Sequence, residues 1–210
     1  MNQHFYRRRP VDNSAIPNVI FALLVANGLL FALQQLRGDL MLAWFALWPL
    51  ASHYPWPEFR IWQLLTYGFL HGNIWHIFFN MFALWMFGRD LERIMGPQRF
   101  LIYYLTCVIG AGIVQVVVAA LQGGVYSTIG ASGGVFGILL AYGMAFPNNT
   151  VMLLFPPIPM KAKHFVIVFG LLELFIGVSG AAPGVAHFAH LGGMLFGFLL
   201  LQYWRRRRFR

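Results

Sequence analysis

Long stretches without a charged residue constrain this chain more than any other feature. Residues 16–36, 61–88 and 100–160 contain no Asp, Glu, Lys or Arg, and residues 165–204 contain only Glu173. A membrane-spanning helix needs about 20 predominantly apolar residues, and every one of these runs is long enough. Only 10% of the chain is charged, whereas a soluble domain carries about 25%. The sequence therefore predicts a membrane protein and argues against a disordered chain or an ordinary soluble domain.

Breaks rich in Gly, Pro and Asn divide these runs into six predicted helices. The longest run is interrupted after Gln122 and again around Pro147 and Pro156, and the last run is interrupted around Pro183. We expect an all-α polytopic membrane protein with six transmembrane helices. The expected helices cover roughly residues 16–36, 72–88, 100–121, 132–146, 165–180 and 185–204.

The basic residues are sorted to one side of this predicted topology. Thirteen of the 15 Lys and Arg precede the first helix, follow the sixth, or join helices two to three and four to five. The positive-inside rule places those segments in the cytoplasm. We therefore expect a basic cytoplasmic segment (1–15), one six-helix domain (16–204) and a basic cytoplasmic tail (205–210). The formal charge of +9 is thus a topology signal with possible lipid headgroup contacts, and we expect no nucleic-acid partner.

The loop between the first two predicted helices is rich in tryptophan. Residues 38–70 hold four of the chain's seven tryptophans: Trp44, Trp48, Trp56 and Trp62. Tryptophan favours the interface between membrane and water. We expect a loop anchored in the outer leaflet, with a short helix within residues 40–48.

Several polar residues interrupt the apolar helices at a similar depth. Polar groups inside a membrane are costly and mark functional sites by default. His76 and Asn80 lie in the outer half of the second predicted helix, Ser132 begins the fourth, and His190 lies near the outer end of the sixth. His76 and Asn80 are four residues apart, which puts them on one helix face. This common depth predicts one site.

Small residues surround Ser132. The segment 130–134 reads Gly-Ala-Ser-Gly-Gly, which leaves the hydroxyl uncovered and lets other backbones approach. A helix over 132–146 spans only about 22 Å of a hydrocarbon core about 30 Å thick. We therefore expect it to begin below the surface, beside a cavity that admits water. The G-x-S-x-G pattern of soluble hydrolases needs a strand before the serine, and this chain lacks the necessary alternation of strands and helices.

A spacing of four between small residues predicts close contact of two helices. Gly133 and Gly137 have this spacing on the fourth predicted helix, as have Gly193 and Gly197 on the sixth. Such pairs permit tight packing of membrane helices. We expect this packing to bring the Ser132 hydroxyl close to the His190 ring.

Three motifs in this order resemble the rhomboid family of intramembrane serine proteases. They are HGNIWHIFFN at 71–80, GASG at 130–133 and AHLGG at 189–193. The likeness extends from about Trp62 to Trp204 and fits the six-span bacterial members. It implies a rhomboid-like bundle with a membrane-associated outer loop.

The resemblance also implies the roles of the site residues. Ser132 would be the nucleophile and His190 the general base. His76 and Asn80, with the Ser132 backbone N–H, would form the oxyanion hole. The supporting residues would be Gly130, Gly133, Phe136 and Gly193. The chemistry agrees, because a serine hydroxyl needs a base to become a good nucleophile and an oxyanion needs donors already aimed at it.

Two positions depart from the family pattern. Gln63 follows Trp62 where an arginine is common, which puts the anchoring of the outer loop in doubt. Phe136 stands where a tyrosine often stacks on the base histidine. Phenylalanine retains the stacking surface and lacks the hydroxyl.

Glu173 is the only acid within the predicted helices near the site. We place it near the middle of its helix, too deep to reach His190, and expect a hydrogen bond to a neighbouring helix. The sequence then predicts a Ser–His dyad with slow turnover, because loss of the acid in a triad costs about 10⁴ in kcat. We expect local hydrogen bonds for His71 and His187. We expect no metal and no cofactor, because no ligating carboxylate or thiolate stands at a plausible spacing.

The sequence thus predicts an endopeptidase that cuts transmembrane segments of other proteins near their outer end. Its partners would be these substrates and the lipid bilayer. A non-catalytic relative that binds membrane helices is the leading alternative, and a transporter or channel is the third class. The absence of a seventh span or a targeting segment leads us to expect a bacterial inner membrane.

Overall fold

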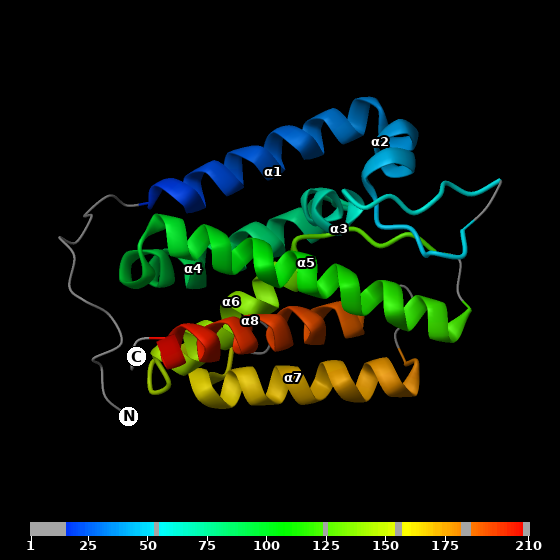
Figure 1. Cartoon of the computed structure of the whole chain (residues 1–210). Coiled ribbons are helices and arrows are strands. Elements are labelled where there is room, and N and C mark those ends of the chain that lie inside the picture. The colour runs from blue at the N-terminus through cyan, green and yellow to red at the C-terminus, as the bar shows by residue number, and fades with distance from the viewer. Residues whose placement is uncertain (1–15, 53–54, 124–125, 154–156, 182–185, 208–210) are drawn as a thin grey trace.

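The structure is a computed structural model that describes residues 16–52, 55–123, 126–153, 157–181 and 186–207 (Figure 1). Its elements are α1 (Asn18–Leu36), α2 (Gly38–Phe45), α3 (Gln63–Thr66), η2 (Tyr67–Phe69), α4 (Ile74–Met95), α5 (Pro97–Gln122), α6 (Ser132–Ala145), β1 (Thr150–Met152), β2 (Pro159–Lys161), α7 (Ala162–Ser179) and α8 (His187–Arg207). The predicted segments 1–15 and 208–210 lie outside the described residues.

The long helices occur where the sequence predicts them, with some shifted ends. Helix α4 continues to Met95, beyond the expected end at residue 88, because Gly96 with a φ of 82° ends it and Pro97 begins α5. A proline is well tolerated at the first position of a helix. Helix α7 begins at Ala162, three residues earlier than expected. The antiparallel pair β1 and β2 was not expected.

Three helices in the described part of the chain are long and apolar enough to cross a membrane: α1, α5 and α7. Helix α6 is apolar but has only 14 residues. The fold is therefore mostly helical with three clear candidate spans, and the count of six spans stays a prediction.

The bundle is built around α5, α6 and α8, with α1 and α7 at opposite outer positions (Figure 1). Large side chains with almost no exposure fill its core, among them Tyr67, Leu84, Leu91, Phe100, Tyr103, Tyr104 and Ile138. Buried hydroxyls have partners on neighbouring elements. Tyr103 donates to the carbonyl oxygen of Gly137 at 2.7 Å, and Tyr67 donates to that of Val108 at 2.8 Å. These bonds tie α5 to α6 and to the turn before α4.

Glycines form the contact between α6 and α8. A Cβ at Gly193 would overlap the backbone carbonyl of Gly133, and a Cβ at Gly137 would come within 3.1 Å of the backbone oxygen of Gly193. Gly197 lies against α5, where a Cβ would overlap the Tyr103 hydroxyl. The two backbones therefore meet without a side chain between them, as the four-residue spacing predicts. We call this contact the glycine seam.

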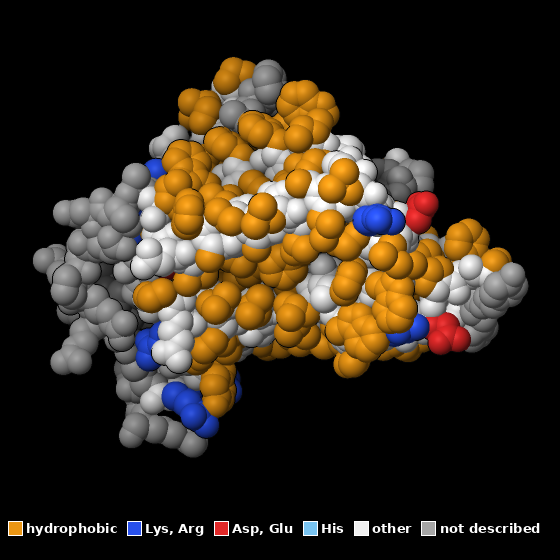
Figure 2. Space-filling model, turned by 90° about the horizontal axis from the view of Figure 1, so that it is seen from above, with side chains coloured by type: hydrophobic (Ala, Val, Ile, Leu, Met, Phe, Trp, Pro, Cys, Tyr) orange, Lys and Arg blue, Asp and Glu red, His pale blue; other side chains and the backbone are white. Residues whose placement is uncertain are grey.

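A buried carboxylate holds α1. Glu92 on α4 is 3% exposed, and its two oxygens accept the backbone N–H groups of Val19 and Ile20 at 3.0 and 2.9 Å. The first N–H groups of a helix have no partner within the helix, so this acid caps α1 from outside. The opposite face of α1 exposes Phe21, Leu29 and other apolar side chains. Figure 2 shows such a face, with hydrophobic side chains across its middle and Lys and Arg toward its ends.

The outer loop is fixed by a glutamine. Gln63 is fully buried, and its side-chain oxygen accepts the N–H groups of Trp48 and Arg60 at 3.2 and 3.1 Å. Its amide nitrogen donates to the carbonyl oxygen of Glu58 at 3.3 Å. Gln63 therefore anchors the loop at the position where an arginine is common in the family. The expected short helix is present as α2.

Candidate active site

Ser132 begins α6, and backbone hydrogen bonds to two other segments hold the chain before it. Thr128 exchanges two backbone hydrogen bonds with Leu47 of the outer loop, at 2.9 and 3.0 Å. The N–H of Gly130 donates to the carbonyl oxygen of Tyr67 at 2.9 Å. Gly130 has a φ of 129°, in the region that favours glycine, and a Cβ there would come within 2.8 Å of the His76 ring. Only glycine fits this turn, and it leaves Ser132 at the start of the helix.

Ser132 and His190 meet across two helices. The Nε2 atom of His190 lies 2.7 Å from the Oγ atom of Ser132. The Phe136 ring stacks on the His190 ring with 4.3 Å between centroids and 4° between planes. Phe136 thus provides the stacking that the sequence predicts, although it lacks the hydroxyl of a tyrosine. The site lies directly beside the glycine seam, so the close approach of α6 and α8 produces the short Ser132–His190 distance.

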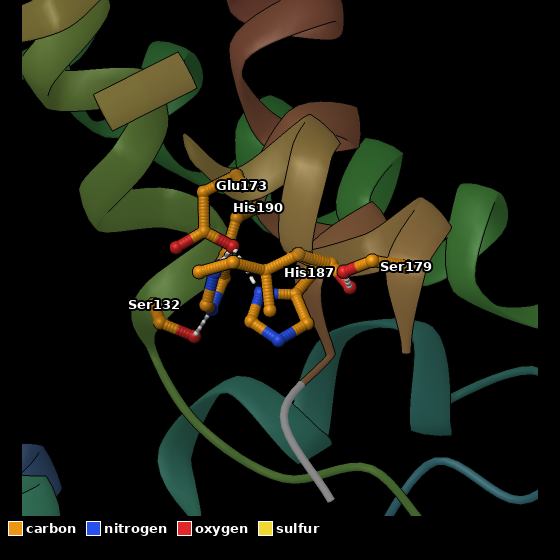
Figure 3. A network of polar contacts seen from close by, with 6 residues as sticks. Ser132, Glu173, Ser179, His187 and His190 are labelled. Atoms are coloured by element: carbon orange, nitrogen blue, oxygen red, sulfur yellow. Dashed lines mark hydrogen bonds and ion pairs between the residues drawn. The ribbon is translucent and has the colours of Figure 1, made fainter. Parts of the chain in front are cut away.

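The prediction that Glu173 lies too deep to reach His190 is wrong. Its Oε2 atom lies 2.9 Å from the Nδ1 atom of His190, on the side of the ring opposite Ser132 (Figure 3). Helix α7 covers Ala162–Ser179, so Glu173 lies just past its middle, in the half that ends at Ser179. Helices α7 and α8 are antiparallel neighbours joined by a short link, so Glu173 and His190 lie at similar heights. The structure thus contains a serine, histidine and carboxylate in line, not the isolated dyad expected from the sequence.

His187 shares the same carboxylate. Its Nδ1 atom lies 2.7 Å from Oε2 of Glu173 (Figure 3), which agrees with the local hydrogen bonding predicted for it. The ligating atoms of Glu173, His187 and His190 all lie within 4.8 Å of one another, a set that could hold a metal ion. The expectation that no carboxylate accompanies these histidines is therefore wrong. The same atoms are engaged in the hydrogen bonds just described.

His76 and Asn80 lie on α4 beside the serine loop. Nδ1 of His76 accepts the backbone N–H of Gly72 at 3.3 Å, which leaves the ring proton on Nε2, the atom that faces Gly130. One N–H of Asn80 donates to the carbonyl oxygen of His76 at 2.9 Å, and a primary amide has a second N–H. The buried His71 ring packs edge-on to His76 at 5.1 Å, and neither of its ring nitrogens has a hydrogen-bond partner among the described residues, contrary to the expectation of local hydrogen bonds. The four residues expected at one depth thus come from three helices that meet.

Known proteins resemble the chain over most of its length. The putative rhomboid protease YdcA of Bacillus subtilis (strain 168) is 32% identical over 139 residues, which are 66% of this chain and 65% of that protein. The rhomboid protease GluP of the same strain is 34% identical over 137 residues, 65% of this chain and 25% of that protein. The mitochondrial Rhomboid protein 1 of Saccharomyces cerevisiae (strain ATCC 204508 / S288c) is 30% identical over 188 residues, which are 87% of this chain and 52% of that protein.

The chain spans between a quarter and two thirds of the length of these relatives. A sequence profile of the Rhomboid domain matches residues 58–207. This match covers more than half of the chain and includes α3 to α8 with every site residue described above. The apolar helices of the chain and its match to the Rhomboid domain indicate that the chain is an integral membrane protein. The chain belongs to the rhomboid family.

Proposed function

We propose that this protein is an intramembrane serine endopeptidase that cleaves transmembrane segments of other membrane proteins near their extracytoplasmic end. The observation that carries the proposal is the 2.7 Å contact between Ser132 Oγ and His190 Nε2. These residues are 58 positions apart and come from different helices. Ser132 lies at the start of a helix, after a loop that is fixed on both sides, and His190 reaches it from another helix. This arrangement fits a nucleophile and its base. Two relatives whose names include protease support the same activity.

Acylation would begin with transfer of the Ser132 hydroxyl proton to Nε2 of His190. The Oγ atom forms a bond to the carbonyl carbon of the substrate, and the π electrons move onto the carbonyl oxygen. When this tetrahedral intermediate collapses, the C–N bond breaks and the leaving nitrogen takes the proton from His190. The products of this step are an acyl-enzyme on Ser132 and a fragment with a free amine.

Deacylation would repeat the sequence with water as the nucleophile. His190 takes a proton from water, and the hydroxide oxygen attacks the acyl carbon. When this intermediate collapses, the C=O bond re-forms, the ester bond to Ser132 breaks, and its electron pair moves onto Oγ. The proton on His190 passes to Oγ, and the second fragment leaves with a carboxyl group. One peptide bond and one water are consumed. Ser132 and His76 are both partly exposed, so water has access to this end of the site.

Donors beside the serine would stabilise the oxyanion. The Nε2 proton of His76 points toward the Gly130 loop, and Asn80 has an amide N–H beyond the one bound to His76. The backbone N–H of Ser132 is at the first position of α6, where a helix leaves its N–H groups without helical partners. Removal of one such donor costs about 10²–10³ in rate. These residues are assigned to the oxyanion hole on this ground.

The same proposal includes the membrane topology. Six long helices would cross or enter the membrane within a single domain over residues 16–204, with both ends of the chain in the cytoplasm. The start of α1, the end of α8 and the α4–α5 connection lie at one end of the bundle (Figure 1), where the basic residues also gather. The site would then open to the extracytoplasmic side. The bacterial inner membrane stays an expectation from the sequence.

Cleavage by the reconstituted protein tests this function. Wild type and Ser132→Ala are placed in liposomes with a reporter protein that carries one transmembrane segment, and fragments are resolved by mass. We expect cleavage by wild type and none by the variant. A serine-directed fluorophosphonate should label wild type and not the variant. Cleavage that survives Ser132→Ala means that the nucleophile is another residue.

A non-catalytic protein that binds membrane helices is the other candidate. Such a protein has no need of a hydroxyl and an imidazole in contact, and this chain brings both together. Reporter that binds to wild-type liposomes but is never cut, with no fluorophosphonate labelling, would favour this alternative.

A further inference from the structure

We propose that Glu173 is a positioning residue that orients His190 for catalysis, so that the site works as a Ser–His–Glu triad. This inference rests on the proposed function and deepens it. Glu173 contacts the base histidine and neither the serine nor the place of the substrate carbonyl, and it therefore acts through His190.

The geometry sets the tautomer of His190. A carboxylate oxygen only accepts hydrogen bonds, so the 2.9 Å contact between Glu173 Oε2 and His190 Nδ1 requires the proton on Nδ1. Nε2 is then the unprotonated atom, and it lies 2.7 Å from the Ser132 hydroxyl. This is the state in which the ring takes a proton from the serine. When it does, the ring becomes a cation next to a carboxylate, which stabilises that charge.

His187 holds the carboxylate in this position. It stands one helical turn before His190 on α8, and its Nδ1 atom lies 2.7 Å from the same Oε2 atom (Figure 3). A carboxylate oxygen has two lone pairs and accepts both N–H groups. The Glu173 side chain is 14% exposed. Two hydrogen-bond donors from α8, His187 and His190, fix it more firmly than His190 alone would. We infer that His187 is the positioning partner of Glu173.

The helix that carries Glu173 is the loosely packed one. The buried residues of α7 are Ala162, Phe165 and Val166, all near its start. Around Glu173, the side chains of Leu171 and Phe175 are 61% and 69% exposed. The carboxylate therefore reaches His190 from a half of α7 that contacts α8 through Glu173 and through Gly177, where a Cβ would come within 3.1 Å of His187. Orientation of His190 should depend on the seating of α7 against α8.

The chain provides a matched control for the test. Glu92 is a second buried carboxylate, and it accepts two backbone N–H groups of α1 far along the chain from the reacting residues. Its loss should lower stability without touching the chemistry. Glu173 and Glu92 are each replaced by Gln, and Glu173 also by Ala and His187 by Leu. For each protein in liposomes, kcat, KM, the rate of fluorophosphonate labelling and the midpoint of thermal unfolding are measured.

We expect Glu173→Ala to lower kcat and the labelling rate about 10²-fold with little change in KM. This is less than the roughly 10⁴-fold effect in a soluble triad because Phe136 and Ser132 also hold the ring. Glu173→Gln loses the charge, and its amide N–H₂ can hold His190 in the wrong tautomer, so it should lose at least as much kcat as Glu173→Ala. His187→Leu should lie between this variant and wild type. Glu92→Gln should lower the unfolding midpoint and leave kcat unchanged.

The outcomes separate this inference from the proposed function. If wild type cleaves and both Glu173 variants keep its kcat, Glu173 has no positioning role. The same conclusion follows if Glu173→Gln loses kcat only in step with a lowered unfolding midpoint, as Glu92→Gln would for a structural acid. A wild-type kcat that falls on chelator treatment and returns with zinc would assign the cluster to a metal instead. Wild type without any cleavage refutes the proposed function and this inference with it.

Discussion

Near His190, helix α8 contacts α6 on one side and α7 on the other, and these two helices pack against it in different ways. On the α6 side the contact is backbone against backbone, because Gly193 lies on the carbonyl of Gly133. On the α7 side the half of the helix that carries Glu173 has no buried residue, and it contacts α8 through the Glu173 carboxylate and through Gly177. The proposed nucleophile is carried by the tightly packed neighbour and the proposed orienting acid by the loosely packed one.

For the proposed protease, this difference separates two demands. The Ser132–His190 distance must be kept within hydrogen-bond reach, and close-packed interiors resist displacement. A substrate helix must also gain access, which requires some element that moves at low cost. Association of membrane helices depends on close packing and on polar contacts, so we expect α7 to be the neighbour that moves. Its movement would carry the carboxylate away while the serine and histidine stay in contact.

The largest effect is expected from a methyl group in the glycine seam. In Gly193→Ala the new Cβ overlaps the Gly133 carbonyl, and backbone cannot yield as a flexible side chain can. Overpacking of this kind costs about 1–3 kcal/mol, and more where backbone must move. We expect a lowered unfolding midpoint and near-complete loss of cleavage, because α8 must shift away from Ser132. Thermal unfolding in detergent and reporter cleavage measure the two effects.

Gly28→Ala is the control for this substitution. A Cβ at Gly28 would meet nothing within 4 Å, and the residue lies on α1 away from the seam. We expect its activity and its unfolding midpoint to match wild type. A Gly193→Ala protein that behaves like this control would mean that the seam does not set the serine–histidine distance.

The next effect concerns the oxyanion donors on the tightly packed side. We expect Asn80→Ala to lower kcat about 10²–10³-fold with KM little changed, because the donor acts on charge that develops in the transition state. Single-turnover cleavage measures the rate of the chemical step. Fluorophosphonate labelling should remain detectable, since Ser132 and His190 keep their contact. Equal kcat values for Asn80→Ala and wild type would remove Asn80 from the oxyanion hole.

The tightly packed half of the site could be predicted from the sequence. The small residues around Ser132, the spacing of Gly193 and Gly197 and the shared face of His76 and Asn80 are local patterns that imply contacts. Glycine at a helix interface has essentially one packing role, so the pattern translates directly into a close approach. The serine loop and the helices α4 to α6 followed from these patterns and from the uncharged runs.

The loosely packed half could not be predicted in the same way. The predicted end of α7 at residue 180 is within one residue of the observed end at Ser179, so the error was in judging which residues of α7 the side chain of His190 can reach. The one available signal was that a lone acid inside an otherwise uncharged run must have a partner. A neighbouring helix was expected, but the histidine on it was excluded by an error in depth. The β1–β2 pair gave no signal because its strands are three residues each.

A smaller effect is expected where α6 touches the base through a side chain. Phe136 stacks on His190, and an aromatic pair contributes about 0.5–1.5 kcal/mol. Phe136→Ala should therefore lower kcat by about twofold to tenfold, since the ring keeps its bonds to Ser132 and Glu173. Phe136→Tyr restores the stacking surface and should match wild type. A Phe136→Ala protein with unchanged kcat would show that the polar contacts alone orient the ring.

The smallest effect should come from a wedge on the loosely packed side. Gly170 lies three residues before Glu173, so both face α8, and a Cβ there would approach only the end of the Met194 side chain, at 3.4 Å. Gly170→Leu should push away the half of α7 that carries Glu173 and weaken the Glu173–His190 bond, with a loss of about twofold in kcat, equivalent to the low end of one hydrogen bond. The unfolding midpoint should barely change, because few buried contacts are lost. Gly170→Ala, whose methyl group fits, should match wild type in both measurements. An unfolding midpoint that falls as far in Gly170→Leu as in Gly193→Ala would mean that α7 is packed as firmly as α6.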